Sequence, residues 1–311
     1  MYDVIIVGAG PAGLTAALYA QRNGKNALVI EKGTIGGQIT SSPKVENIPG
    51  FASLSGNEFA DKFMDQVLAQ GADLELERVT GIEPFEAEGQ PAWKVHTEYG
   101  GDFEGRSVIL ALGVKHRMLG LPGEEDLVGE GISFCAVCDG DFYKGKTVCM
   151  AGGGNSALQE AILLAGKCEK VIMLQDLPVF TGESRLQDVL FAHDNVEKHV
   201  NMKITGIKTE GGKICAVTAI DNATGIEADY PCDGFFEAIG LIPENDDFKG
   251  FADLNQFGYF DSAEDCVTRS AGLFVAGDCR SKFIRQVTTA CGDGAVAALA
   301  ACRYVDMLGA K

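Results

Sequence analysis

One glycine-rich pattern occurs twice in this chain of 311 residues, and its repetition restricts the fold more than any other feature. The first copy runs from Gly8 to Gly13 and the second from Gly152 to Ala157, with glycine at the first and third positions and a small residue at the sixth. Each copy follows an apolar segment and precedes a segment rich in alanine and leucine. This order of strand, glycine turn and helix is typical of a dinucleotide-binding Rossmann unit. We therefore expect an α/β protein with two Rossmann-like dinucleotide-binding domains.

The first copy has the surroundings that dinucleotide binding needs. We expect strands at residues 2–7 and 26–30 and a helix over 14–21, with the pyrophosphate at the helix start, where free N–H groups and the helix dipole favour an anion. Glu31 ends the second strand and is placed to accept hydrogen bonds from a ribose. The loop residues expected to hold the phosphates are Gly8, Gly10, Pro11, Ala12 and Gly13.

The second copy repeats this arrangement in the middle of the chain. We expect strands at residues 146–151 and 170–174 and a helix over 158–165. Asp176 follows the later strand, much as Glu31 does in the first copy. Two such sites predict two nucleotides, a tightly held flavin dinucleotide and an exchangeable cofactor. The loop residues expected to bind the second nucleotide are Gly152, Gly154, Asn155, Ser156 and Ala157.

Two later segments fit the first domain better than the second. Residues 107–113 and 272–278 each contain an apolar strand that ends near a glycine, and an alanine-rich helix follows the later one. The first domain is therefore predicted to be interrupted, with the second domain inserted in it. The expected boundaries are 1–114 with 246–311 for the interrupted domain, and 115–245 for the inserted one.

The charge balance excludes several classes of partner. Lysine and arginine number 26 against 44 aspartate and glutamate, which gives a net charge of 26 − 44 = −18. Such a chain repels nucleic acid and anionic membrane surfaces. No uninterrupted apolar stretch is long enough to span a bilayer, and the apolar start at residues 4–7 is too short for a secretion signal. A cytoplasmic location is expected.

Only two of the ten cysteines, Cys135 and Cys138, lie close together in the sequence. The other eight are expected to be small buried hydrophobic residues. No second CxxC and no spaced histidine pair completes the roughly four ligands that zinc needs, so no metal site is predicted. The pair instead predicts a redox-active dithiol at a helix start, where the dipole favours a thiolate. The neighbouring Asp139 and Asp141 are turn residues or, if protonated, a proton source for a leaving sulfur.

A series of motifs in the same order resembles the low-molecular-weight thioredoxin reductases over nearly the full length, with no single motif carrying the likeness. These motifs are Gly8–Gly13, Gly36-Gly37-Gln38, Glu46-Asn47-Ile48-Pro49-Gly50, Cys135–Gly140, Gly152–Ala157, Gly277-Asp278, Arg285-Gln286-Val287 and Gly292–Ala295. The resemblance implies an enzyme, a thioredoxin-disulfide reductase, with FAD in the interrupted domain, a pyridine nucleotide in the inserted domain, thioredoxin as acceptor, and a homodimer. It also implies that one domain rotates against the other between half-reactions. The sequence offers residues 114–118 and 241–246 as candidate linkers, and linkers at the domain border that hold Gly113 and Gly240 are the expected hinges.

The same resemblance assigns roles to single residues. Cys138 would face the flavin, Cys135 would attack thioredoxin, and Asp139 would donate the proton. Asp278 would bind a sugar or ribityl hydroxyl, although an aspartate at a strand end is also a common helix N-cap. The further residues expected to bind FAD, beyond the loop at 8–13, are Glu31, Gly36, Gly37, Gln38, Asn47, Val79, Gly113, Gly277, Arg285, Gln286 and Val287.

The sequence departs from this family in the segment expected to bind the electron-donating cofactor. Members that use NADPH carry a His-Arg-Arg run after the second strand of the inserted domain, whereas residues 174–185 here lack that run and contain Asp176. At about 4 Å, two like charges repel by ~1 kcal/mol in water and ~4 kcal/mol at an effective dielectric near 20. An aspartate also suits the free ribose diol of NADH. We rank NADH first, ferredoxin second and NADPH third as the electron donor.

Other interpretations follow from the same residues. A ferredoxin-dependent flavin enzyme with a non-functional nicotinamide site would need a basic patch, for which the candidates are Lys115, His116, Arg117, Arg280, Lys282 and Arg285. The acceptor could be a peroxiredoxin-type protein or a small disulfide instead of thioredoxin. A flavin-binding redox sensor without turnover is the alternative of another class. Residues 123–126 are expected to be a solvated acidic turn, and the four histidines surface residues.

Overall fold

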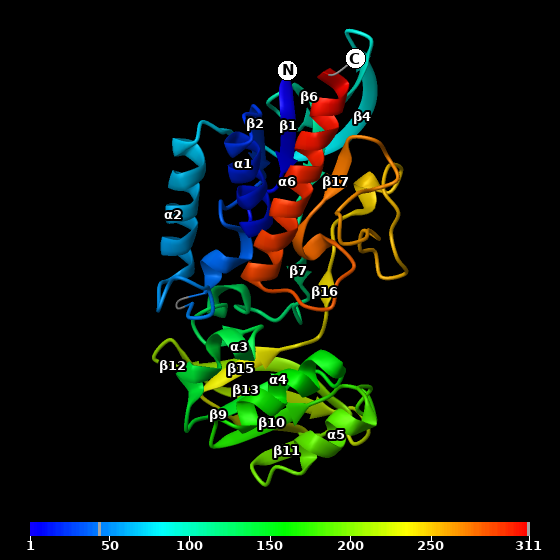
Figure 1. The fold of residues 1–311 in the computed structure, drawn as a ribbon. Helices are drawn as coiled ribbons and strands as arrows, with labels where there is room; N and C mark the ends of the chain where they lie inside the picture. The colour runs from blue at the N-terminus through cyan, green and yellow to red at the C-terminus, as the bar shows by residue number, and fades with distance from the viewer. Residues whose placement is uncertain (43–44, 310–311) are drawn as a thin grey trace. The chain divides into compact units, whose positions relative to one another are not determined.

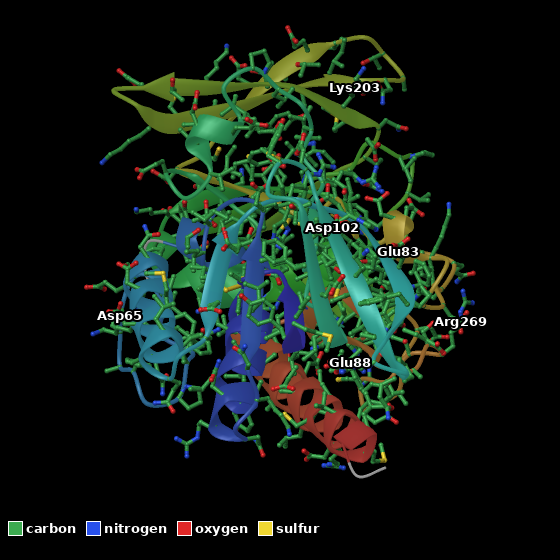
Figure 2. The ribbon with its side chains drawn as sticks, turned by 90° about the horizontal axis from the view of Figure 1, so that it is seen from above. Asp65, Glu83, Glu88, Asp102, Lys203 and Arg269 are labelled. Atoms are coloured by element: carbon green, nitrogen blue, oxygen red, sulfur yellow. A yellow bond between two sulfur atoms is a disulfide. The ribbon has the colours of Figure 1, made fainter. Side chains whose placement is uncertain are left out.

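The computed structural model describes residues 1–42 and 45–309. The chain divides into two compact units: residues 1–115 with 242–311 form unit 1, and residues 116–241 form unit 2 (Figure 1). Within the described residues, no helix is both long and apolar enough to cross a membrane. Figure 2 labels four exposed acidic side chains of unit 1, which belong to Asp65, Glu83, Glu88 and Asp102.

Unit 1 is built on a sheet of seven strands. Its strands are β1 (Tyr2–Val7), β2 (Ala27–Glu31), β3 (Asp73–Leu76), β4 (Val79–Ala87), β5 (Gln90–Thr97), β6 (Asp102–Leu110) and β17 (Leu273–Val275). Its helices are α1 (Pro11–Arg22), α2 (Gly56–Ala69) and α6 (Val287–Gly309), with short 3₁₀ turns η1 (Gly37–Ser41), η4 (Asp246–Phe248) and η5 (Gly277–Cys279).

The parallel part of this sheet has the order β3-β2-β1-β6-β17, and β5 and β4 extend it in antiparallel fashion from the first half of β6. Strand β1 is buried on both faces, so its residues read as a continuous apolar run. One face packs against α1 and α6 through Val4, Ile6 and Ala297. The other packs Ile5 and Val7 against strands β4 and β5 and the segment around Phe260.

Unit 2 contains a second parallel sheet and a smaller antiparallel one. Its strands are β8 (Ile132–Ser133), β9 (Thr147–Ala151), β10 (Lys170–Leu174), β11 (Val196–His199), β12 (Met202–Glu210), β13 (Lys213–Asp221), β14 (Glu227–Pro231) and β15 (Gly234–Glu237). Its helices are α3 (Ala136–Asp139), α4 (Asn155–Ala165) and α5 (Ser184–Phe191), with 3₁₀ turns η2 (Glu125–Leu127) and η3 (Gly140–Tyr143).

The parallel sheet of unit 2 has the order β11-β10-β9-β15-β8 and is covered on both faces. Helices α3, α4 and α5 pack on one face around Met150, Leu158 and Leu164. The antiparallel sheet β12-β13-β14 packs on the other face around Cys149 and Phe235. The glycine-rich loops of both units therefore lie at the carboxyl end of a central parallel strand, where α/β proteins bind ligands.

The two chain segments that connect the units pair with each other. Strand β7 (Lys115–His116) and strand β16 (Leu241–Ile242) form a two-stranded sheet. Next to it, the Arg117 amide donates to the Gly240 carbonyl at 2.9 Å. The two connecting segments are therefore hydrogen-bonded to each other through their backbones.

The structure corrects three details expected from the sequence. Residues 123–126 are not a solvated turn throughout, because Glu124 is buried and accepts hydrogen bonds from three backbone amides. His116 is partly buried and stacks on Phe134 with ring centroids 4.2 Å apart, and burial lowers its pKa to about 4. Cys215 is exposed on β13, unlike the buried cysteine expected there. The environment is decided by the folded-back backbone at 119–121 for Glu124, by Phe134 for His116 and by its place on β13 for Cys215.

Candidate functional site

The first glycine-rich loop brings the start of α1 against the end of β1. Gly8 has φ +107°, and a Cβ there would lie 2.4 Å from the Ala111 carbonyl oxygen. A Cβ at Gly13 would lie 1.8 Å from the Gly8 carbonyl oxygen, so both positions require glycine. Helix α1 starts with Pro11 after Gly10, and its first turn has neither a side-chain cap nor an acidic residue. Its N-terminal amides therefore remain available for an anion.

Glu31 lies at the end of β2 and is bonded to the turn around it. Its two carboxylate oxygens accept the Ala9 amide at 2.7 Å and the Gly33 amide at 2.8 Å. These bonds fix the carboxylate beside the glycine-rich loop, with lone pairs left for a ribose diol.

The residues from 36 to 38 approach the same loop from the other side. The Gly36 amide donates to the Ala9 carbonyl at 2.8 Å. Gly37 has φ +63°, and a Cβ there would lie 3.4 Å from Gly10 Cα. The Gln38 side chain donates to the Val114 carbonyl. These contacts place the turn at residues 36–38 beside the first glycine-rich loop.

Asp278 lies in η5, shortly after β17, in a segment that contacts the glycine-rich loop. A Cβ at Gly277 would lie 2.8 Å from Ala12 Cβ, which shows how closely the two segments approach. The Asp278 Oδ1 atom is buried without a hydrogen-bond partner, and burial raises the pKa of this carboxyl to about 6. A buried acceptor without a donor in this place fits the hydroxyl of a bound sugar or ribityl chain. Arg285 supports the segment by donating to the Asp278 carbonyl at 3.2 Å.

The remaining predicted FAD residues are placed less tightly. Asn47 and Gln286 are brought together by a side-chain hydrogen bond of 3.0 Å. Gly113 follows β6 with φ +66°, and Val287 begins α6 and packs against the cluster around Val45. Val79 begins β4 and packs against the core of unit 1.

The second glycine-rich loop repeats the geometry of the first within unit 2. Gly152 has φ +116°, and a Cβ there would lie 2.5 Å from the Ala238 carbonyl oxygen. Gly154 is the N-cap of α4, whose first turn has no side-chain cap and no acidic residue. Ala157 is buried, whereas Ser156 is exposed.

The loop after β10 closes over this second glycine turn. The amides of Thr181 and Gly182 donate to the Gly153 carbonyl at 2.8 and 2.9 Å. Asn155 exchanges two hydrogen bonds with Glu183, one from each residue. Asp176 is exposed at the start of the loop. An acidic side chain therefore stands at each end of this loop, and no basic residue lies between Asp176 and Glu183.

Cys135 and Cys138 form a disulfide at the start of the short helix α3, with Cα atoms 5.3 Å apart. Cys135 is the N-cap of this helix, and its sulfur accepts the Cys138 amide at 3.1 Å. Both side chains are partly exposed. Since an N–H group already points at the Cys135 sulfur, the thiolate formed on reduction would be stabilised there.

Asp139 directly follows Cys138 in the sequence and is buried. Ser133 donates to its Oδ2 atom at 2.6 Å, while Oδ1 is buried without a partner. Burial raises the pKa of the carboxyl, although the bond from Ser133 acts in the opposite direction. A carboxyl that favours its protonated form beside a disulfide can supply a proton to a leaving sulfur.

Sequence reasoning missed two polar residues that hold this segment. Ser133 also accepts the Cys135 amide at 3.1 Å, and Glu160 of α4 accepts the Ala136 amide. Glu160 could have been noticed, because it shares a helical face with Ala157 and Leu164, where an apolar residue is expected. Ser133 carries no such local signal.

Several residues of the candidate basic patch pair with acidic side chains, and one of them is buried. Arg280 is only 6% exposed and pairs with Asp293 at 2.9 Å. Lys282 pairs with the same carboxylate at 2.9 Å, and Lys115 pairs with Glu244 at 2.7 Å. Arg280 and Lys282 share one carboxylate, and Glu244 also pairs with Lys32, so these ion pairs reduce the local positive charge without cancelling it.

Comparison with known proteins places this arrangement in a family. The chain is 38% identical over 308 residues to the thioredoxin reductase of Bacillus subtilis, covering 99% of this chain and 96% of that protein. The solved thioredoxin reductase of Streptococcus pyogenes matches with a TM-score of 0.90 and 35% identity, covering 99% of each chain. That of Lactococcus lactis matches with a TM-score of 0.69 and 33% identity, covering 99% of this chain and 100% of that one. The family model described as pyridine nucleotide-disulphide oxidoreductase matches residues 2–294, and the chain belongs to this family.

Proposed function

We propose that the protein is an FAD-dependent thioredoxin reductase that takes electrons from NADH. The observation that carries the proposal is the Cys135–Cys138 disulfide beside the buried carboxyl of Asp139, in the same unit as the second glycine-rich loop. Relatives at 37–38% identity over nearly the whole chain are named thioredoxin reductases. Membership of the family implies FAD and a pyridine nucleotide as cofactors.

The residues of unit 1 fit FAD. The open start of α1 suits the pyrophosphate, Glu31 the adenosine ribose, and the unpartnered oxygen of Asp278 a ribityl hydroxyl. When bound, FAD supplies a two-electron carrier between the electron donor and the disulfide. We assign to this site the loop at residues 8–13, the turn at 36–38 and the segment at 277–278.

The residues of unit 2 handle the sulfur chemistry. Two electrons and two protons convert the Cys135–Cys138 disulfide into two thiols, and Asp139 is positioned by Ser133 to provide one of the protons. The Cys135 thiolate, stabilised by the Cys138 amide, would then attack an acceptor disulfide to form a mixed disulfide. Attack by Cys138 on Cys135 would release the reduced acceptor and restore the internal disulfide.

The choice of NADH rests on the loop after β10. Its exposed Asp176 can accept hydrogen bonds from a ribose diol and repels a 2′-phosphate. The pairing of Lys115, Arg280 and Lys282 with acidic residues favours NADH over ferredoxin. Anaerobic stopped flow should therefore show faster flavin bleaching with NADH than with NADPH or reduced ferredoxin, and reduction by ferredoxin alone would reject this choice.

Asp176→Ala is expected to lower kcat/KM for NADH by about tenfold, because one or two hydrogen bonds to the ribose are lost. The same variant should change kcat/KM for NADPH little or raise it, since a repulsive charge is removed. Steady-state kinetics with both nucleotides measure the ratio. Asp188→Ala, an exposed aspartate on α5, is the matched control. An unchanged NADH-to-NADPH ratio in Asp176→Ala would show that this carboxylate does not contact the ribose.

Thioredoxin is the proposed acceptor, and a homodimer is the proposed assembly. Turnover should be compared with thioredoxin, a peroxiredoxin-type protein and a small disulfide under the same NADH supply. A clear preference for one of the latter two would show that thioredoxin is not the main substrate, but it would not contradict the proposed sulfur chemistry. Light scattering of the holoenzyme tests the dimer.

A further inference from the structure

One of the backbone amides between the two cysteines, that of Ala136, donates to a carboxylate on another helix. Ala136 is fully buried and starts α3, and its N–H donates to Oε2 of Glu160 on α4. The neighbouring amides have other partners: the Cys135 amide donates to Ser133, and the Cys138 amide donates to the Cys135 sulfur. Glu160 therefore ties the backbone between the two cysteines to α4.

The position of Glu160 on α4 is unusual for a glutamate. Ala157, Ala161 and Leu164 lie on the same face of the helix and are buried in the core of unit 2. A charged side chain in such a row is disfavoured unless a partner compensates its desolvation. The N–H of Ala136 is a partner of this kind, but it leaves a negative charge beside the disulfide.

Three influences shift the pKa of Glu160. Burial raises the pKa of Glu160, the Ala136 amide lowers it, and the charge of Asp139 raises it further. On η3, which follows α3, Asp141 is paired with Lys167, just beyond α4, at 2.8 Å, and Tyr143 is neutral because burial raises its pKa to about 12. When Asp139 is ionised, its charge therefore raises the pKa of Glu160.

We propose that Glu160 is a positioning residue for the redox-active pair: its carboxylate fixes the Ala136 amide, and its negative charge opposes ionisation of Cys135. The proposal deepens the proposed function and rests on it for the role of Cys135. In physical terms, one side chain keeps the sulfur turn in place and disfavours a second negative charge on the neighbouring thiol.

Glu160→Gln separates charge from geometry, because the amide oxygen can still accept the Ala136 N–H. We expect the pH profile for alkylation of Cys135 in the reduced holoenzyme to move to lower pH by about one unit, since removing a nearby negative charge lowers the pKa of the thiol. The measurement is the rate of iodoacetamide labelling against pH, read at the Cys135 peptide by mass spectrometry. The pH profile of thioredoxin reduction should move in the same direction. Reduction of the flavin by NADH should not change.

Glu160→Ala removes both the charge and the acceptor, so the same shift should appear together with a lower Tm. Glu169→Gln, which neutralises an exposed glutamate just beyond α4, is the matched control and should leave the profile unchanged. A Glu160→Gln profile that superimposes on that of the wild-type protein would overturn the proposal, whatever the Tm. Labelling needs neither thioredoxin nor NADH, so an inactive wild-type protein would reject the proposed function without deciding the role of Glu160.

Discussion

Replacing Cys138 with serine is expected to lower thioredoxin reduction by at least about a thousandfold, while flavin reduction by NADH stays within about twofold of the wild-type rate. The reason is stoichiometric, because an internal disulfide needs two sulfur atoms and the structure pairs Cys138 with Cys135. The remaining Cys135 thiol can attack an acceptor, but no second thiol then resolves the mixed disulfide.

Stopped-flow absorbance of the flavin and a coupled thioredoxin assay measure the two half-reactions separately. Cys215→Ser is the matched control, since Cys215 is a free, exposed cysteine of the same unit and should be dispensable. If Cys138→Ser retained more than about a tenth of the wild-type turnover, electrons would be reaching the acceptor by another route.

Glu237→Gln is expected to stabilise unit 2 by about 3 kcal/mol at pH 8, and the gain should shrink toward pH 5. Glu237 is 2% exposed at the end of β15, and neither of its carboxylate oxygens has a partner when ionised. Burial and the adjacent carboxyl of Glu124 raise its pKa from 4.5 to about 9. Glu124 already accepts the amides of residues 119–121, so it offers Glu237 no donor.

The sign of the pH dependence follows from this raised pKa. In the unfolded chain the carboxyl ionises near 4.5, whereas in the folded protein it ionises only near 9. The wild-type protein is therefore most stable below pH 4.5 with respect to this group, and it loses that stability progressively as the pH rises to about 9. Glutamine does not titrate, and its amide can donate to Glu124.

Urea unfolding at pH 5 and pH 8.5 tests this second expectation. Glu130→Gln, at an exposed glutamate in the same unit, should change stability by less than about 0.5 kcal/mol at either pH. A Glu237→Gln protein that gained equal stability at both pH values would show that the effect does not arise from ionisation.

The features that could be predicted from the sequence are those encoded by neighbouring residues. The glycine loop at residues 8–13 and the one at 152–157 each carry strand, turn and helix within a short segment, so local pattern is enough to place them. The helices begin earlier than expected, at Pro11 and Asn155 instead of 14 and 158, because a glycine N-cap starts each one directly after the turn.

The features that escaped prediction depend on contacts that form only when the chain folds. Glu124 looks like one of several acids in a turn, yet its neighbours at 119–121 fold back over it and donate to it. Glu160 meets Ala136 only because α4 packs on α3. Arg280 looks like an exposed cation, yet it is buried and pairs with Asp293 of α6. Contacts of this kind leave no periodic signal in the chain.

Anaerobic reductive titration of the purified holoenzyme tests the central claim most directly. If electrons pass from bound FAD to the Cys135–Cys138 disulfide, full reduction of the wild-type protein should consume four electrons per FAD, two for the flavin and two for the disulfide, and the Cys138→Ser protein should consume two. A wild-type protein that takes up only two electrons per FAD, or that remains colourless when supplied with FAD, would contradict the account.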